Sequence, residues 1–206
     1  MNELLSWKNY VLSLRAASLL RTDQIAGEFS GKNIALVGNS RSLAKKSLGD
    51  QIDACDIVVR FNTCPMVGEK SHGCRTDWIA TSMKIPRNFH RQLNARGILW
   101  LSPRRRKMPV WLLFEKNLYV LPRTMARQIM TSPADRPSTG LMMIHLLSTL
   151  DIATGNLFGF DFFKSLSLSG DHTQETAPHD FSTEETLVRR LMQQDERFRL
   201  CGEPSS

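Results

Sequence analysis

The stretch from residue 33 to residue 62 constrains the fold more strongly than any other part of the chain. It opens with four apolar residues, Ile34–Val37, which end at the turn Gly38-Asn39-Ser40. Apolar residues among polar ones follow, and a second run, apolar except for Arg60, occupies 57–61. This succession predicts a strand, a tight turn, a helix and a second strand, which make a βαβ unit with two parallel strands.

Two asparagines follow the two predicted strands. Asn39 lies in the turn and Asn62 comes directly after the second strand. The carboxyl ends of parallel strands meet at one edge of a sheet, where open α/β folds bind ligands. Two short amides at this edge favour a hydroxyl-rich, phosphorylated ligand, and the aperiodic stretch 63–77 predicts a binding loop beside it. The turn matches neither G-x-G-x-x-G nor G-x-x-x-x-G-K-[ST], so alone it is equally compatible with a plain turn.

The rest of the chain continues the alternation of strands and helices. A length of 206 residues suffices for one domain with a full core. We therefore predict a single Rossmann-like α/β domain at 31–203, with a mostly parallel twisted sheet flanked by helices. A helical segment at 1–30 packs on it or leads into it, with 27–33 as the connection. Further strands are predicted at 78–83, 97–101, 117–121, 156–160 and 198–201. Further helices are predicted at 3–21, 86–94, 123–130, 141–147 and 183–194, the last with Leu187 and Leu191 inward.

The turn Pro137-Ser138-Thr139-Gly140 precedes a stretch that is apolar nearly all round, which is typical of a buried helix. A Ser or Thr cap followed by glycine leaves N–H groups unpaired at the positive end of the helix. Such an end can bind a phosphate or a ribose, and it is equally compatible with a capped core helix. His145, inside the apolar stretch, is interpreted as a core histidine with its hydrogen bonds satisfied. In the later strand, Gly159 permits close approach of another backbone or a ligand.

The net charge of +7 favours an anionic partner, such as a nucleotide, a nucleic acid, an acidic glycan or an anionic membrane. The densest basic run consists of Arg104, Arg105, Arg106 and Lys107. Prolines on both sides predict an exposed loop rather than a helix. The run is compatible with a solvated surface, with membrane contact or with an acidic acceptor. Because no aromatic residues interleave with these cations, specific nucleic-acid recognition is not expected.

The cysteines give no sign of a metal or redox site. Cys55, Cys64, Cys74 and Cys201 include no C-x-x-C pair and no histidine at zinc spacing, so we predict free thiols. No secretory signal is visible, and no run of about 18 apolar residues predicts a membrane span. A cytoplasmic location is therefore expected.

With the later motifs included, the chain resembles the eukaryotic-type sialyltransferases, which are inverting enzymes that use CMP-linked sialic acid. Residues 34–68 are similar to the family's large sialyl motif, and residues 137–160 to its small sialyl motif. His172-Thr173-Gln174-Glu175 is similar to a degenerate third motif, whose middle positions are normally aromatic. Residues 179–184 fit the very small motif, a histidine and a glutamate separated by four residues. The four motifs follow one another in the family's order.

The resemblance implies a role for several side chains. His179 would be the general base for the acceptor hydroxyl, and His172 would assist departure of the CMP phosphate. Glu184 would orient or support this segment, or act only as a cap partner of the last helix. The residues implied to hold CMP are Asn39, Ser40, Asn62, Ser138, Thr139 and Gly140.

The implied fold is a variant GT-A fold, and the implied reaction is inverting transfer without a metal. The chain has no convincing D-x-D pair, so neither a metal nor another cofactor is expected. The donor would be CMP-sialic acid or the CMP form of a related acidic sugar, such as Kdo or another nonulosonic acid, because the CMP-binding motifs do not read the sugar. The acceptor would be a glycan or glycolipid in surface-glycan synthesis.

The departures from the family are also informative. Its large and small motifs each carry a cysteine, joined by a disulfide, where this chain has Ile34 and Ile152. A reducing cytosol would allow this loss, with a packed aliphatic pair in place of the bond. The chain therefore resembles a compact, bacterial-like cytoplasmic member, with peripheral contact to the inner membrane through the basic run.

Two other functional classes remain compatible with the sequence. A non-catalytic CMP- or nucleotide-binding module would keep Asn39, Asn62 and Ser138 but would tolerate loss of His179. A basic nucleic-acid-binding protein would bind through the basic run with steep salt dependence. The degenerate third motif makes the first of these the stronger alternative.

Overall fold

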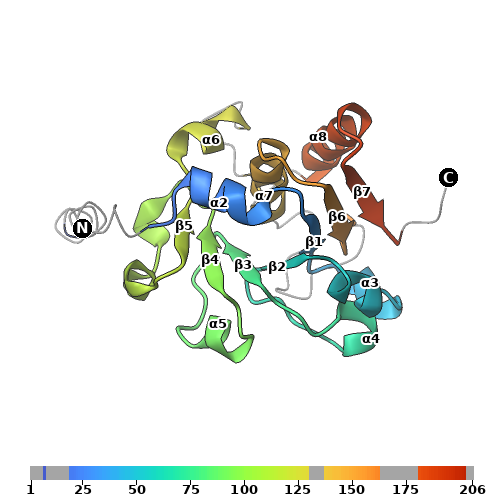
Figure 1. Cartoon of the computed structure of the whole chain (residues 1–206), viewed down its shortest axis with the longest axis horizontal. Helices are drawn as coiled ribbons and strands as arrows, with labels where there is room; N and C mark the ends of the chain where they lie inside the picture. The colour runs from blue at the N-terminus through green and yellow to red at the C-terminus, as the bar shows by residue number, and fades with distance from the viewer. Residues whose placement is uncertain (1–6, 8–18, 130–136, 163–180, 203–206) are drawn as a thin grey trace.

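A single parallel sheet organises the structure, a computed structural model that describes residues 7, 19–129, 137–162 and 181–202. Within these residues the sheet has seven strands in the order β5-β4-β3-β2-β1-β6-β7 (Figure 1). All neighbouring strands are parallel, which confirms the predicted Rossmann-like α/β fold. The strands are β1 (Asn33–Val37), β2 (Ile57–Phe61), β3 (Trp78–Thr81), β4 (Gly97–Trp100), β5 (Leu118–Val120), β6 (Thr154–Phe158) and β7 (Phe198–Cys201).

Helices cover both faces of the sheet. Figure 1 shows α2, α6, α7 and α8 on one side and α3, α4 and α5 on the other. The α-helices are α2 (Thr22–Phe29), α3 (Gly49–Asp53), α4 (Glu69–His72), α5 (Phe89–Gln92), α6 (Arg123–Gln128), α7 (Thr139–Ser148) and α8 (Phe181–Gln194). The 3-10 helices are η2 (Arg41–Lys45), η3 (Arg105–Lys107) and η4 (Val110–Phe114).

The central strands are mostly apolar because both of their faces are buried. In β1, Ile34 and Leu36 join the core cluster under α2 and α7, whereas Ala35 and Val37 join a second cluster on the opposite face. Alternate residues of one strand therefore belong to different cores, as expected for a parallel sheet between two helical layers.

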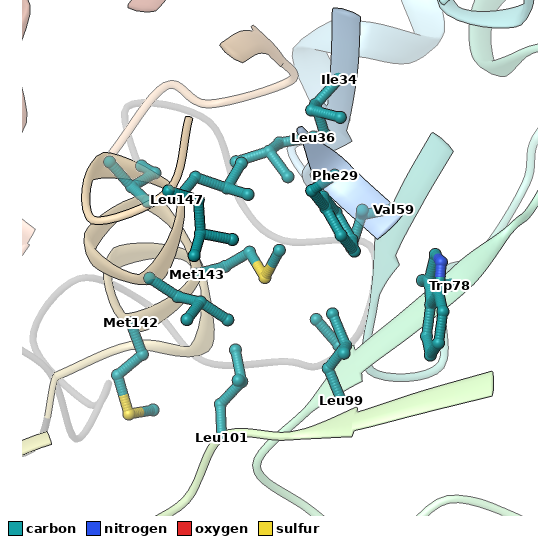
Figure 2. Packing of buried hydrophobic residues seen from close by; sticks show 14 of the residues in the cluster. Phe29, Ile34, Leu36, Val59, Trp78, Leu99, Leu101, Met142, Met143 and Leu147 are labelled. Atoms are coloured by element: carbon teal, nitrogen blue, oxygen red, sulfur yellow. The ribbon is translucent and has the colours of Figure 1, made fainter. Parts of the chain in front are cut away.

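Helix α7 forms the centre of the larger core. Met142, Met143 and Leu147 are buried, as the apolar stretch predicts. Figure 2 shows the side chains of this helix facing those of the sheet, with Leu36 and Leu101 among their neighbours in the same cluster. The N-terminus of α7 is thereby fixed against the sheet.

His145 is the polar exception on α7. It is half-buried, and its Nε2 lies 3.1 Å from Oε1 of Gln128 in α6. Burial lowers the pKa of His145. Its interpretation as a satisfied histidine of the packed interior is therefore supported.

Helix α2 is an element that the sequence pattern did not predict. It begins directly after the helix predicted at 3–21 and its last three residues lie in the connection predicted at 27–33, and its Ile25 and Phe29 are buried in the main core. The helix has only eight residues, with Gly27 inside it, so its apolar stripe is too short to stand out. The helix predicted at 3–21 lies largely outside the described residues, and the domain boundary at residue 30 stays a prediction.

The helix predicted between β1 and β2 is divided into η2 and α3. Helix α3 packs so closely on α4 that a Cβ at Gly49 would lie 1.9 Å from the Glu69 carbonyl oxygen. The backbone of α3 therefore needs a glycine there, and one long amphipathic helix would not bring it this near to α4.

The inward face of α8 differs by one position from the prediction. Leu187 is 39% exposed, so its predicted inward placement is wrong. Val188 is buried instead, and Leu191 packs against the main core as predicted. The inward residues of α8 are therefore 184, 188 and 191. Because residue 184 is a glutamate, a pattern based on apolar residues alone does not find this face.

The two isoleucines at the positions where the resemblance implies cysteines lie in the same core. Ile34 and Ile152 are both buried in the main cluster. A Cβ on Gly155, the register partner of Ile34 on β6, would lie 3.5 Å from Cδ1 of Ile152 and 2.6 Å from the Phe198 ring, so this part of the core is tightly packed. All four cysteines of the chain are free thiols, as predicted. Among the described residues, no helix is both long and apolar enough to cross a membrane.

Candidate functional site

The sheet has its topological switch point between β1 and β6. β1 pairs with β2 on one side and with β6 on the other, although β6 follows β1 by more than a hundred residues. Connections that leave a parallel sheet in opposite directions open a crevice at the carboxyl ends of the strands, where α/β folds bind ligands. The turn Gly38-Asn39-Ser40 and residue Gly159 lie at this point.

Two glycines allow the strand ends to meet there. Gly38 N donates to the Phe158 carbonyl (2.8 Å), and Ser40 N donates to the Gly159 carbonyl (3.4 Å). A Cβ on Gly38 would lie 2.5 Å from the Gly159 oxygen, and Gly159 itself has φ +66°. The predicted close approach at Gly159 is therefore to another backbone, that of Gly38.

The two predicted asparagines lie on either side of the end of β2. Asn39 Nδ2 donates to the Phe61 carbonyl (3.1 Å). Asn62 adopts φ 54°, and its Oδ1 accepts from Thr81 Oγ1 (3.2 Å). One polar atom of each amide is held by the protein, while Asn39 Oδ1 and Asn62 Nδ2 have no hydrogen-bond partner among the described residues. The structure thus brings both asparagines to the same edge, as predicted.

The N-terminus of α7 presents two unpaired amides. Ser138 caps the helix by accepting from Leu141 N (3.1 Å). The N–H groups of Thr139 and Gly140 have no acceptor in the described part of the chain. A Cβ on Gly140 would lie 2.9 Å from the Phe160 ring, so glycine keeps this turn close to the end of β6. The prediction of a capped helix with free N–H groups is confirmed.

Glu184 connects α8 to this helix start. It is only 7% exposed, and its Oε1 accepts a hydrogen bond of 2.6 Å from Ser138 N. The carboxylate therefore binds the neighbouring helix, and it places negative charge beside the positive end of α7. Glu184 thus links the first turn of α8 to the start of α7, and its functional role stays a prediction.

Ser40 is engaged by protein groups rather than open to a ligand. It is buried, and its Oγ lies 2.9 Å from Ser42 Oγ, which donates to Asp161 Oδ2 (3.1 Å). Phe160 packs edge-on against Phe61 at 5.7 Å between ring centroids. Asp161 and Phe160 were missed as site residues, although both directly follow the strand that ends at the predicted close approach.

A buried arginine anchors the long loop after Asn62. Arg60 is 1% exposed in the middle of β2. Its Nε donates to the Arg75 carbonyl and to Thr76 Oγ1, both at 2.9 Å, and its Nη2 donates to the His72 carbonyl at 2.8 Å. Burial lowers the pKa of Arg60, and burial raises the pKa of the neighbouring Cys64 to about 11. These hydrogen bonds hold the later part of the loop 63–77 against β2. The loop contains the short helix α4, which the aperiodic sequence did not predict.

The basic run does not form the exposed loop that we predicted. Arg105–Lys107 make the 3-10 helix η3, and Met108 behind them is buried. Arg106 and Lys107 are exposed, whereas Arg104 and Arg105 are partly buried. Met108 anchors the turn in the core, so the cations do not share one solvent-facing surface.

The two predicted catalytic histidines, His172 and His179, lie outside the described residues, and their roles stay predictions. Within the described ranges, no group of three His, Cys, Asp or Glu side chains is arranged to hold a metal ion.

Comparison with known sequences places the resemblance in the N-terminal half. A family model described as glycosyltransferase family 29 (sialyltransferase) matches residues 10–96. The CMP-N-acetylneuraminate-beta-1,4-galactoside alpha-2,3-sialyltransferases of Homo sapiens and Rattus norvegicus are 44% and 43% identical over 61 residues. The resemblance to the sialyltransferases is confirmed. The matched segment is 27% of this chain and spans only 16% of each of these sialyltransferases.

Solved structures extend the likeness to most of the fold. A mammalian sialyltransferase in complex with Gal-beta-1-3GalNAc-ortho-nitrophenol superposes with a TM-score of 0.62 at 17% identity, covering 88% of this chain and 73% of that one. The sialyltransferase CstII from Campylobacter jejuni, in complex with the substrate analogue CMP-3FNeuAc, gives 0.52 at 14% identity, covering 82% and 80%. The chain therefore has the sialyltransferase fold.

Proposed function

We propose that this chain is an inverting, metal-independent glycosyltransferase. It transfers sialic acid, or a related acidic sugar such as Kdo or another nonulosonic acid, from the CMP form to a hydroxyl of a glycan or glycolipid. The observation that carries this proposal is the convergence of Asn39, Asn62 and the two free amides of α7 at the switch point of a sialyltransferase fold. The names of the sequence relatives and the CMP-3FNeuAc complex of CstII support the choice of donor.

The α7 start suits the phosphate of CMP. The free N–H groups of Thr139 and Gly140 would donate to phosphate oxygens, and the helix dipole would favour the negative charge. Asn39 Oδ1 would accept from a ribose hydroxyl, and Asn62 Nδ2 would donate to the nucleotide. Ser138 would shape this turn, since its Oγ caps the helix and its N–H is bound by Glu184.

In the proposed step, His179 takes the proton from the acceptor hydroxyl as the acceptor oxygen attacks the anomeric carbon of the sugar. The bond from that carbon to the CMP phosphate breaks, and the phosphate oxygen keeps the electron pair. His172, as an imidazolium, offsets the charge on the departing phosphate. No proton or electron is needed from any further reactant, so the step balances without a redox partner.

Glu184 would be the positioning residue for this chemistry. His179 stands two residues before the first residue of α8, and two peptide units span at most about 8 Å. The bond from Glu184 to Ser138 ties the first turn of α8 to the phosphate-binding start of α7. This contact would allow α8 to hold the segment that precedes it, with His179, near the donor site.

We also propose that the protein works in the cytoplasm, in surface-glycan synthesis, with peripheral contact to the anionic inner membrane. Arg106 and Lys107 are the exposed members of the basic run and are the cations suited to lipid headgroups.

The test is release of free CMP from CMP-Neu5Ac and from CMP-Kdo, each with EDTA present and with water as the acceptor. We expect one donor to be cleaved and the rate to fall roughly 10²- to 10⁴-fold in His179→Ala, the range typical of a lost general base. His145→Gln serves as the matched control, because Nε2 of His145 lies 3.1 Å from Oε1 of Gln128 in α6 and the residue has no part in the proposed step. Calorimetry with CMP is run on the same samples.

Each outcome bears on one class of function. Turnover that survives EDTA and depends on His179 supports the transferase. CMP binding without cleavage of either donor, and without effect of His179→Ala, would identify a non-catalytic CMP-binding module. Absence of CMP binding contradicts the proposal, and tight salt-dependent binding of nucleic acid in its place would identify the third class.

A further inference from the structure

Two arginines follow neighbouring strands at the far end of the sheet edge that carries the donor site. Arg105 follows β4 and Arg123 follows β5. Trp100 and Val120, the last residues of these strands, are register partners, and Leu121 N donates to the Trp100 carbonyl at 2.9 Å. Because β4 and β5 run parallel to β1, both arginines emerge at the same carboxyl edge as Asn39.

Arg105 lacks partners that a partly buried guanidinium normally has. Its Nε is buried and has no hydrogen-bond acceptor, although the residue as a whole still reaches solvent. Burial lowers the pKa of Arg105, and the nearby charge of Arg123 lowers it further. Among the described residues, no carboxylate lies within ion-pair distance of Arg105 or Arg123.

This arrangement is unfavourable unless an anion completes it. A buried donor without an acceptor costs about 1–3 kcal/mol, and two like charges side by side repel. A group with two or three oxygens and a negative charge would relieve both, because a guanidinium offers a planar fork of donors that matches carboxylate and phosphate. A modest rotation of the Arg105 side chain would present Nε–H and one Nη–H together to such a group.

We propose that Arg105 and Arg123 form a binding site for a carboxylate or phosphate group of the acceptor. The assignment to the acceptor rests on the proposed transferase function. The site is separate from the one for the donor phosphate, since β4 lies three strand spacings from β1, or about 15 Å. An acidic glycan extending along the sheet edge would reach both places, so the chain would use acceptors that already carry a negative charge.

The neighbouring cations supply a matched control. Lys107 lies two residues after Arg105 but is exposed, as a cation that merely faces solvent or a membrane would be. If the run acts only as a diffuse basic surface, loss of Lys107 will matter as much as loss of Arg105 or Arg123. If the proposed pair is a defined site, the two arginines will matter far more.

The experiment follows the Arg105 Nε–H signal by NMR in the full chain labelled with ¹⁵N-arginine. The probes are inorganic phosphate, 3′-sialyllactose, and lactose as the same glycan without the carboxylate. We expect phosphate and 3′-sialyllactose to shift the signal to saturation and lactose to leave it unchanged.

Arg123→Gln should weaken binding roughly ten- to hundredfold, as for loss of a charge-assisted hydrogen bond, and Lys107→Gln less than twofold. Arg105→Lys, followed by calorimetry, should weaken binding about tenfold because it keeps the charge and loses the fork.

Several results would overturn the inference. These are an equal response to lactose, an equal loss in Lys107→Gln and Arg123→Gln, or a response to phosphatidylglycerol vesicles with none to phosphate or 3′-sialyllactose. The last result would mean that the two arginines contact a membrane.

Binding to the arginine pair is measured without CMP, so the anion site and the transferase function are tested independently. A chain that binds CMP but gives no Arg105 response contradicts only the inference, whereas anion binding without CMP binding contradicts the transferase and its acceptor assignment.

Discussion

The two ends of the carboxyl edge of the sheet are built from different chemistry. At β1 and β6, the polar groups are neutral amides, and several of them make one bond to the protein and leave one atom for a ligand. At β4 and β5, the polar groups in question are Arg105 and Arg123, and no described carboxylate lies within ion-pair distance of either guanidinium. The first end is held in place by the protein before any ligand arrives, whereas the second is completed only by an anion.

This difference suggests that one end of the edge selects the ligand and that the other end attracts anions. A neutral, preorganised set of donors and acceptors selects a ligand by geometry and responds weakly to ionic strength. A pair of guanidiniums attracts any suitable anion and is screened by salt. A transferase with this layout would recognise its nucleotide at one end and admit an acidic partner at the other.

The largest effect is expected from breaking the anchor of the neutral end. Glu184→Ala leaves Ser138 N without its charged acceptor in a buried position, so we expect a loss of about 2–3 kcal/mol in the free energy of unfolding, with weaker CMP binding. Glu185→Ala is the matched control, because Glu185 is the next residue of the same helix and forms an i,i+4 pair with Arg189. Its loss should cost less than about 1 kcal/mol. Denaturant unfolding checks both values, and equal losses would refute a special role for Glu184.

A second variant tests how tightly the strand ends meet at this neutral end. Gly38→Ala places a Cβ against the Gly159 carbonyl oxygen, so we expect a destabilisation of about 1–3 kcal/mol and a distorted CMP site. Gly27→Ala, where no atom lies within 4 Å of the new Cβ in helix α2, should stabilise the protein by about 0.5–1 kcal/mol. Thermal unfolding of the two variants should therefore shift in opposite directions. A neutral Gly38→Ala would show that the contact is not needed.

A third test sharpens the contrast in ligand recognition. Asn39→Ala removes one neutral hydrogen bond and should weaken CMP binding about fivefold. The double variant Arg105→Gln/Arg123→Gln should leave CMP affinity within about twofold, because those cations lie about 15 Å away across the sheet. Calorimetry with CMP measures both changes. If the double variant loses as much CMP affinity as Asn39→Ala, the two ends are not separate sites.

The smallest effect concerns pH and the loop between the two ends. His72 is buried with its Nε2 unpaired, and burial, then the charge of Arg60, lowers its pKa below the ordinary 6.5. The unfolded chain therefore binds a proton more readily than the folded protein, so the contribution of His72 to stability is complete above about pH 6.5 and is lost as the pH falls below it. We expect His72→Asn to flatten the fall of the unfolding free energy between about pH 6.5 and 5. An unchanged slope in pH-dependent denaturant unfolding would contradict this assignment.

Much of the neutral end could be predicted from the sequence because its signals are local. The apolar run of β1 stops at Gly38-Asn39-Ser40, and α7 starts at a capped turn, so the end of the strand and the start of the helix are both visible in the local sequence. Parallel pairing then brings Asn39 and Asn62 to one edge without further information. The strands could be predicted from short, mostly apolar stretches, since both faces of the sheet are buried.

What could not be predicted depends on contacts between distant residues. The bond from Glu184 to Ser138 joins residues 46 positions apart, and no spacing rule encodes it. The phase of α8 was wrong for the same reason, because its inward face begins with that buried glutamate rather than with Leu187. The division of the basic run depends on Met108, which enters the core beneath η3. The prolines on either side of the run indicate a turn, but they do not determine which of its arginines is buried.

The central place of β1 in the sheet has a consequence for how the protein is made. β1 receives its second neighbour, β6, only when residues 154–158 are available, and the α7 contact with Glu184 comes later still. A nascent chain that ends soon after residue 96, which includes the whole segment matched by the family model, would expose one unpaired flank of β1 to other chains. Assembly must therefore wait for almost the entire polypeptide, and the long sequence separation of these contacts favours slow folding and gives chaperones a period in which to act.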